Sequence, residues 1–227
     1  MTQASLSAIQ SLLDHSLLKP TLTLTELEIG CRQAVQLGVA SVCILPYFVE
    51  RCAELLAGSS TLPTTTLAFP HGVLPLSAKL SELSAALDAG AREIDVVVNL
   101  SLVASREFGL VEREVRELTG ACHDRGARIK VIFETCTLEL DQKIALCEIC
   151  GAAGVDWVKT STGFGSGGAT PEDVRLLREH TPETVQVKAS GGIRDLASVL
   201  MYRDLGATRI GTSASREILQ AARARFG

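Results

Sequence analysis

The chain has 227 residues, enough to bury a substantial core, and its 46% hydrophobic and 21% charged residues are proportions of an ordinary globular protein. A formal net charge of −4 without a dense Lys/Arg stripe argues against nucleic-acid binding, although a small basic pocket for an anion is compatible with it. The first ten residues lack the pattern of a secretory signal, and no apolar run approaches the roughly 20 residues that span a bilayer. We therefore expect a cytoplasmic protein that binds neither nucleic acid nor membrane.

The seven cysteines are scattered through apolar segments, which favours reduced thiols over disulfides. Cys147 and Cys150 form a C-x-x-C pair inside a helix-like segment. Core packing is the main interpretation of this pair. Metal or redox chemistry is the alternative, weakened because no second Cys/His pair has ligand-like spacing. No His and carboxylate spacing indicates a metal site, so we expect none.

The chain begins with an amphipathic segment, residues 5–13, that has the pattern of a helix, and residues 12–17 follow as a short candidate strand. After them, β-branched runs alternate with longer amphipathic runs. The seven clear strands are residues 41–45, 65–69, 93–98, 129–134, 156–160, 185–189 and 208–212. The expected helices are residues 25–37, 47–56, 77–88, 110–123, 140–152, 171–180, 196–205 and 215–223.

This alternation implies parallel strands joined by right-handed helical crossovers. With residues 12–17 as a strand, the pattern predicts an α/β fold, a (β/α)8 TIM barrel with an extra N-terminal helix, and the length is close to the roughly 250 residues typical of that fold. No linker-like stretch divides the chain, so we expect a single domain over residues 1–227. An open doubly wound sheet is the alternative, disfavoured because the first βα turn lacks a G-x-G-x-x-G motif.

Charged residues recur within the expected strands, where alternate side chains face the barrel interior. With Lys159 and Lys188 facing inward, the valines beside them face the helices. The same alternation places further residues inward: Cys43, Asp95, Val97, Asn99, Lys130, Ile132, Glu134, Trp157 and Gln186. A structural ion-pair network is the plain interpretation of one buried charge. Five inward charges favour an active site, because perturbed ionisable groups gather at functional sites: Asp95, Lys130, Glu134, Lys159 and Lys188.

Lys159 and Lys188 lie on consecutive strands, which are neighbours in a barrel at a spacing of about 4.8 Å. Repulsion between two ammonium groups and partial burial both disfavour the charged form, so one lysine is expected to become a nucleophilic amine. A lysine amine of this kind forms Schiff bases with carbonyl substrates. Asp95 is expected to hold the second lysine charged and to relay protons through water.

Two glycine-containing loops follow the last two strands. The first is S-G-G-I-R with Gly191, Gly192 and Arg194, and the second is G-T-S-A-S with Gly211 and Ser213. Barrels of this type often bind phosphate at this position through backbone N–H groups. We therefore expect a phosphate site there, with Arg194 supplying charge or lying in a salt bridge on the rim. The roles of Cys43, His15 and His71 are left unassigned.

The motifs that carry these residues resemble deoxyribose-phosphate aldolase, a family of class I, Schiff-base-forming aldolases with a TIM-barrel fold. They span nearly the whole chain: D-H-S-L-L-K-P (14–20), A-S-V-C (40–43), E-I-D-V-V-V-N (93–99), K-V-I-F-E-T (130–135), V-K-T-S-T-G-F-G-S-G-G-A-T-P-E-D-V (158–174), V-K-A-S-G-G-I-R (187–194) and A-T-R-I-G-T-S-A (207–214). The resemblance implies that Lys159 is the Schiff-base lysine, with Lys188 and Asp95 as the partner lysine and proton-relay acid. It also implies that the two loops are the phosphate cradle.

The implied reaction is reversible cleavage of 2-deoxy-D-ribose 5-phosphate to acetaldehyde and D-glyceraldehyde 3-phosphate, in deoxyribose catabolism. The resemblance implies no cofactor, since the lysine iminium supplies the activation that a metal provides in class II aldolases. The implied partners are phosphosugars and small aldehydes, and a homodimer is compatible with the family. Alternatives are another Schiff-base enzyme of phosphosugars, such as a transaldolase-like or ketose aldolase, and a catalytically silent barrel that binds phosphosugars.

The chain departs from the family pattern at two places. Leu45 stands where many members have asparagine before a proline, and A-F-P-H-G-V-L-P-L (68–76) replaces a G-F-P-x-G-A segment. Both departures follow strand ends, at the expected substrate-facing rim. We expect them to affect which acceptor aldehydes are tolerated and the level of activity, without touching the lysine pair.

Overall fold

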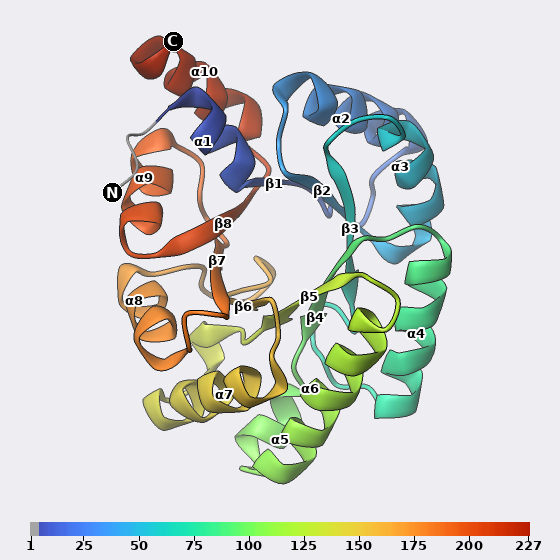
Figure 1. The fold of residues 1–227 in the computed structure, drawn as a ribbon, viewed down its shortest axis with the longest axis vertical. Coiled ribbons are helices and arrows are strands. Elements are labelled where there is room, and N and C mark those ends of the chain that lie inside the picture. Colours follow the sequence, from blue (N-terminus) through green and yellow to red (C-terminus); the bar gives the residue numbers. More distant parts are fainter. Residues whose placement is uncertain (1–4) are drawn as a thin grey trace.

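Eight parallel strands pair in chain order, and β8 closes back onto β1 (Figure 1). The computed structural model describes residues 5–227. Its strands are β1 Leu13–Leu17, β2 Ser41–Ile44, β3 Leu62–Leu67, β4 Glu93–Val97, β5 Arg128–Ile132, β6 Trp157–Lys159, β7 Gln186–Ser190 and β8 Ala207–Thr212. The predicted (β/α)8 barrel is confirmed, and the short candidate strand near the N-terminus forms β1, which completes the eight strands. The alternative of an open sheet is wrong, since the sheet has no free edge.

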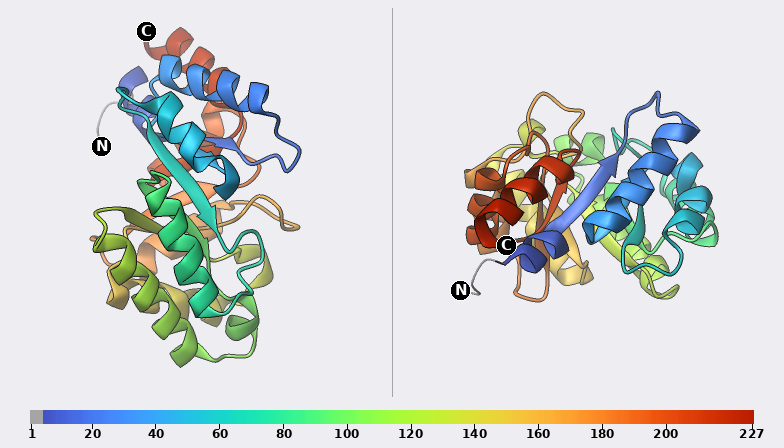
Figure 2. Two further views of the ribbon diagram at one scale, coloured as in Figure 1. Left: turned by 90° about the vertical axis from the view of Figure 1, so that its right-hand side faces the viewer. Right: turned by 90° about the horizontal axis from the view of Figure 1, so that it is seen from above.

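Helices surround the barrel as an outer ring (Figures 1 and 2). They are α1 Leu6–Leu12, α2 Leu24–Leu37, α3 Val49–Leu56, α4 Leu76–Asp88, α5 Leu100–Ala104, α6 Phe108–His123, α7 Leu140–Ala153, α8 Pro171–His180, α9 Leu196–Asp204 and α10 Ser215–Phe226, with short 3-10 turns η1 Pro46–Phe48 and η2 Thr135–Thr137. The extra N-terminal helix α1 packs against α10, as the right-hand view of Figure 2 shows. None of the helices in the described part of the chain is both long and apolar enough to cross a membrane.

Several element boundaries differ from the sequence prediction. Strand β3 starts at Leu62, earlier than expected, and ends before Ala68, whose backbone is left-handed (φ 52°). The short helix α5 was not predicted. Strand β5 ends at Ile132, so the alternation that placed Glu134 inward no longer applies there. Glu134 itself has a left-handed backbone (φ 53°), which turns the chain into η2.

The strands have one apolar and one polar face. Val131, Val158 and Val187 are paired in register across β5, β6 and β7, and all three are fully buried in the core between strands and helices. The alternate residues of the same strands, Lys159 and Lys188 among them, face the interior of the barrel. Burial of apolar surface in the outer layer stabilises the barrel, while the interior is free to carry charge.

Candidate active site

Lys159 and Lys188 are paired across β6 and β7, and both contact one carboxylate oxygen. The Nζ atoms of Lys159 and Lys188 lie 2.8 and 2.6 Å from Oδ2 of Asp95 on β4. All three side chains are almost completely buried. The structure therefore brings the predicted lysine pair and its carboxylate together at hydrogen-bond distance.

Lys130 completes the group around Asp95. Its Nζ lies 2.7 Å from Oδ1 of Asp95 and 2.7 Å from Oε2 of Glu93. Three of the other four predicted inward charges thus converge on the carboxylate of Asp95. The fifth, Glu134, does not join them, for the backbone reason given above. Asn99 also leaves the interior, because its side chain caps α5 by accepting the N–H of Leu102.

Three further charged residues belong to the cluster and were not found from the sequence. Asp14 lies 2.5 Å from Nζ of Lys188, and Arg209 bridges Asp14 (2.5 Å) and Glu93 (2.9 Å). Strand alternation held the signal for all three, because Asp14, Glu93 and Arg209 fall on the same faces as Ser16, Asp95 and Gly211. The sequence prediction considered only His15 in the segment L-D-H-S-L.

The carboxylates and lysines shift one another's ionisation. Burial disfavours the charged form of Lys188, but the carboxylates of Asp14 and Asp95 outweigh it and raise its pKa. For Lys130, burial is likewise outweighed by Asp95 and Glu93, and its pKa is raised. Burial opposes ionisation of Asp95 too, yet Lys130, Lys159 and Lys188 hold its pKa well below the usual value.

The pKa of Lys159 shifts in the opposite direction from that of Lys188. Burial is the largest cause, and with the charge of Lys188 it lowers the pKa of Lys159 below its ordinary value, against the pull of Asp95. Both expected causes, the charge of Lys188 and burial, lower this pKa, and burial is the larger of the two. Lys159 has one carboxylate partner, which it shares, whereas Lys188 has two. Of the paired lysines, Lys159 therefore loses its proton more easily.

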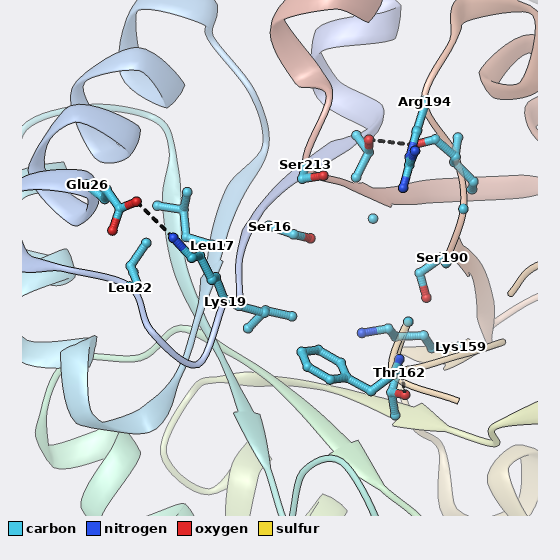
Figure 3. Close-up of a pocket in the computed structure, with 18 residues that line it drawn as sticks. Ser16, Leu17, Lys19, Leu22, Glu26, Lys159, Thr162, Ser190, Arg194 and Ser213 are labelled. Carbon is cyan, nitrogen blue, oxygen red and sulfur yellow. Dashed lines mark hydrogen bonds and ion pairs between the residues drawn. The ribbon is translucent and has the colours of Figure 1, made fainter. Parts of the chain in front are cut away.

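A cavity of about 510 Å³ opens above Lys159 at the carboxyl ends of the strands (Figure 3). Ser190, Arg194 and Ser213 border one side of it, and Lys19 and Glu26 lie across from them. All five residues expected in the phosphate loops border this cavity: Gly191, Gly192, Arg194, Gly211 and Ser213. Lys159 and the two loops therefore border one pocket. Lys159 is the member of the charged cluster that reaches the base of this pocket.

Two glycines shape the wall of this pocket. Gly191 has a positive φ of 92°, a conformation that L side chains rarely adopt. At Gly211, a Cβ atom would lie 2.9 Å from Cβ of Ser190 and 3.3 Å from Cε of Lys188, so a side chain here would crowd both residues. Arg194 is exposed and makes no ion pair within residues 5–227, which leaves its charge facing the cavity and solvent. The rim salt bridge considered for Arg194 is absent from this described part.

Glu134 has a different position from the one expected. Its carboxylate accepts a short hydrogen bond from the hydroxyl of Thr162 and another from the Thr162 N–H at 3.2 Å. Thr162 borders the cavity, and its hydroxyl oxygen accepts the N–H of Phe164 at 3.0 Å. Glu134 thus anchors the loop that follows Lys159 instead of joining the charged cluster.

The residues left unassigned also have defined places. His15 faces away from the interior, with Nδ1 3.0 Å from the Ser215 hydroxyl, and burial lowers its pKa. His71 is exposed in the β3–α4 loop. Cys43 lies 4.0 Å from Asp95, and burial raises its thiol pKa to about 11. Cys43 is therefore a neutral member of the interior cluster.

The C-x-x-C pair is part of the core. Cys147 and Cys150 are fully buried in α7, and burial raises the pKa of Cys147 to about 12. Residues 5–227 contain no group of three or more His, Cys, Asp or Glu side chains arranged to hold a metal ion. Cys147 and Cys150 therefore pack in the core of the protein.

Neither departure from the family pattern borders the cavity. Leu45 precedes η1 at the end of β2 and is partly buried. In the 68–76 segment, Phe69 packs edge-on against Phe164 with ring centroids 5.2 Å apart. Phe164 borders the cavity and is 47% exposed. The second departure therefore reaches the pocket through Phe164.

Comparison with known proteins agrees with this arrangement. The model of the DeoC/LacD family of aldolases matches residues 7–221. Deoxyribose-phosphate aldolase of Rhodopirellula baltica is 50% identical over 219 residues, covering 96% of this chain and 91% of that protein. The corresponding protein of Thermococcus gammatolerans is 41% identical, covering 95% and 96%. A solved deoxyribose-phosphate aldolase from Aeropyrum pernix, described as a tetramer, superposes with a TM-score of 0.89 at 32% identity, covering 97% of this chain and 93% of that one. On these matches the chain belongs to the DeoC/LacD family of aldolases.

Proposed function

We propose that the protein catalyses reversible cleavage of 2-deoxy-D-ribose 5-phosphate to acetaldehyde and D-glyceraldehyde 3-phosphate, through a Schiff base on Lys159. The observation that carries this proposal is the position of Lys159: a buried amine with one shared carboxylate partner, at the base of a pocket bordered by the glycine loops. The relatives named deoxyribose-phosphate aldolase support the choice of substrate.

Lys159 suits the nucleophile role better than its neighbours. Lys188 and Lys130 each contact two carboxylates within 2.7 Å, which stabilises their charged forms. Of these three lysines, Lys159 alone borders the cavity. An amine must be neutral to attack a carbonyl carbon, so the lysine with the lowered pKa and access to the cavity is the one that reacts.

The reaction begins when Nζ of Lys159 adds to the aldehyde carbon of the open-chain sugar. Loss of water from the resulting carbinolamine gives an iminium, which withdraws electrons from the adjacent carbon. Removal of the proton from the C3 hydroxyl then breaks the C2–C3 bond of the sugar. This step releases D-glyceraldehyde 3-phosphate and leaves an enamine on Lys159. Protonation of the enamine carbon and hydrolysis of the imine release acetaldehyde and restore Lys159.

The proton transfers are assigned to Asp95 and Lys188, acting through water. Lys188 stays charged because Asp14 and Asp95 raise its pKa, so it serves as the acid that protonates a leaving hydroxyl or a carbanionic carbon. Asp95 is ionised and contacts both lysines, so it can pass a proton between them. These two residues therefore supply the acid and base that the iminium steps require.

The phosphate is assigned to the loops at Gly191–Arg194 and Gly211–Ser213. Gly191 and Gly192 have positive φ angles (92° and 78°) and border the cavity, and the backbone N–H groups of glycine loops at this place in a barrel often bind phosphate. Arg194 adds a positive charge with no competing ion pair in residues 5–227. The reaction as proposed needs no metal or organic cofactor, and we propose a single-domain cytoplasmic enzyme that forms a homodimer.

Covalent trapping tests the proposal. The protein is incubated with acetaldehyde and sodium borohydride and then mapped by peptide mass spectrometry, in parallel with cleavage assays. We expect a reduced adduct on Lys159 and a loss of activity of roughly 10³-fold or more in Lys159→Met. Lys143→Met, which removes a lysine of α7 that pairs with Asp173, is the matched control and keeps wild-type activity. An unlabelled Lys159, or an active Lys159→Met variant, contradicts the mechanism.

The products separate the competing functions. Acetaldehyde release from 2-deoxy-D-ribose 5-phosphate supports the proposal, whereas dihydroxyacetone phosphate release from a ketose phosphate indicates a ketose aldolase. Binding of phosphosugars without turnover indicates a silent barrel. A coupled assay for each product distinguishes the three.

A further inference from the structure

We infer that Arg209, at the amino-terminal end of the barrel interior, is a positioning residue that keeps Lys159 in its unprotonated form. This role presupposes the proposed Schiff-base function of Lys159. Arg209 does not border the cavity, so it acts through the carboxylates between the two ends of the barrel.

Arg209 is held firmly in place. Its guanidinium contacts Oδ1 of Asp14 at 2.5 Å and both carboxylate oxygens of Glu93 at 2.9 and 3.2 Å. It also lies over the ring of Trp157, 4.9 Å from the centroid. A register shift between β7 and β8 places Arg209 beside Lys188. Its side chain is 7% exposed, so water screens its charge poorly.

The interior holds more positive than negative groups. Every strand but β3 contributes a titratable side chain, and β3 contributes the uncharged hydroxyl of Thr64. The titratable groups are Asp14 on β1, Cys43 on β2, Glu93 and Asp95 on β4, Arg128 and Lys130 on β5, Lys159 on β6, Lys188 on β7 and Arg209 on β8. Leaving aside Arg128 at the exposed end, four cations face three carboxylates. The charges balance when one of the four cations is neutral. Lys159 has the fewest carboxylate partners, so it is the cation that loses its proton.

Arg209 creates this excess. Without it, three lysines would face three carboxylates, and the balanced state would include a protonated Lys159. The carboxylates of Asp14 and Glu93, released from Arg209, would also attract Lys188 and Lys130 more strongly and leave Asp95 to Lys159. Both effects stabilise the ammonium form of Lys159. Imine formation would then require a higher pH.

Arg128 provides a matched control. Its guanidinium contacts the same carboxylate, Oε1 of Glu93, at 2.5 Å. Its side chain is 43% exposed, however, so solvent screens its charge from the interior. Removing Arg128 therefore tests whether burial of the charge, and not contact with Glu93, determines the effect on Lys159.

The experiment measures the initial rate of Lys159 labelling by acetaldehyde and cyanoborohydride as a function of pH, with the adduct located by mass spectrometry. In Arg209→Met we expect the midpoint of the rise with pH to move up by roughly one pH unit, the usual scale on which a nearby charge moves the pKa of a buried group. Arg209→Lys and Arg128→Met are expected to stay within about 0.3 pH units of wild type. Glu93→Gln, which removes one carboxylate, is expected to move the midpoint down.

The outcomes separate this inference from the proposed function. A wild-type protein that is not labelled at Lys159 overturns both. Labelling at Lys159 with an unchanged midpoint in Arg209→Met overturns only the role of Arg209, and so does an equal shift in Arg128→Met. If circular dichroism shows that Arg209→Met does not fold, Glu93→Gln decides: a downward shift supports the role, and an unchanged or upward midpoint overturns it.

Discussion

Lys159 and Lys188 are paired directly across β6 and β7 and donate to the same oxygen of Asp95, yet their pKa values shift in opposite directions. Lys188 has a second carboxylate, Asp14, and Lys159 has none. One contact therefore separates a charged lysine from one that gives up its proton. Burial alone would lower the pKa of both.

Substitution of Lys188 should change the pH dependence of imine formation. In Lys188→Met, the positive charge beside Lys159 is lost and Oδ2 of Asp95 pairs with Lys159 alone, so the pKa of Lys159 rises. Labelling of Lys159 by acetaldehyde and borohydride should therefore begin at higher pH than in wild type, and cleavage of the phosphosugar should slow because the acid is absent. A rate profile measured against pH checks the direction, and a shift to lower pH would contradict it.

Gly211→Ala should impair the site by crowding it. The new Cβ would lie 2.9 Å from Cβ of Ser190 and 3.3 Å from Cε of Lys188, so Ser190 must shift and the Lys188 side chain, which contacts Asp95, must give way. We expect about 1–3 kcal/mol loss in the free energy of unfolding and a fall in kcat of tenfold or more, by order of magnitude. Gly120→Ala, in α6 with nothing near its Cβ, is the control and should be neutral or stabilising. Equal kcat in both variants would refute the crowding argument.

Glu134→Ala should loosen the loop that follows Lys159. The carboxylate accepts both the hydroxyl and the N–H of Thr162, and without it this loop loses its anchor to β5. We expect KM for the phosphosugar to rise by roughly tenfold, because Thr162 and Phe164 border the cavity. Glu134→Gln keeps one acceptor oxygen for both donors and should retain most of the wild-type KM. Steady-state kinetics compare the two, and similar KM values would count against the anchor.

Lys79→Met should destabilise the fold away from the site. Nζ of Lys79 lies 2.7 Å from Oε1 of Glu114 and 2.9 Å from the Val97 carbonyl oxygen, all of them buried. Its loss leaves a buried carboxylate unpaired, which costs about 3–5 kcal/mol. Arg113→Ala breaks an exposed ion pair with Glu117 on α6, the helix that carries Glu114, and should cost less than about 1 kcal/mol. Urea unfolding of the two variants measures the difference.

The cost in Lys79→Met should depend on pH. Burial raises the pKa of Glu114 above its usual value even with Lys79 present. A carboxyl group whose pKa is raised by folding destabilises the native state at higher pH, and this penalty disappears as pH falls through the folded-state pKa. Lys79→Met should therefore be closer to wild type at roughly pH 5 than at roughly pH 7.5. A deficit that grows on acidification would contradict this assignment.

The order of strands and helices was present in the sequence, because apolar periodicity follows from which faces are buried. The alternation around Val158 and Val187 placed Lys159 and Lys188 inside the barrel, and their neighbouring strands placed them side by side. The glycine loops were predicted for the same reason: the ends of parallel strands meet at one face.

Only the tertiary structure decided which charges meet. Glu134 lies outside the interior because the backbone turns at the end of β5, and no local sequence pattern predicted that turn. Asp14 and Arg209 joined the cluster from strands at the two ends of the sequence, which become neighbours when the barrel closes. The ionisation of Lys159 depends on distances among charged groups from six strands, and pairwise electrostatics of this kind are defined only once the chain has folded.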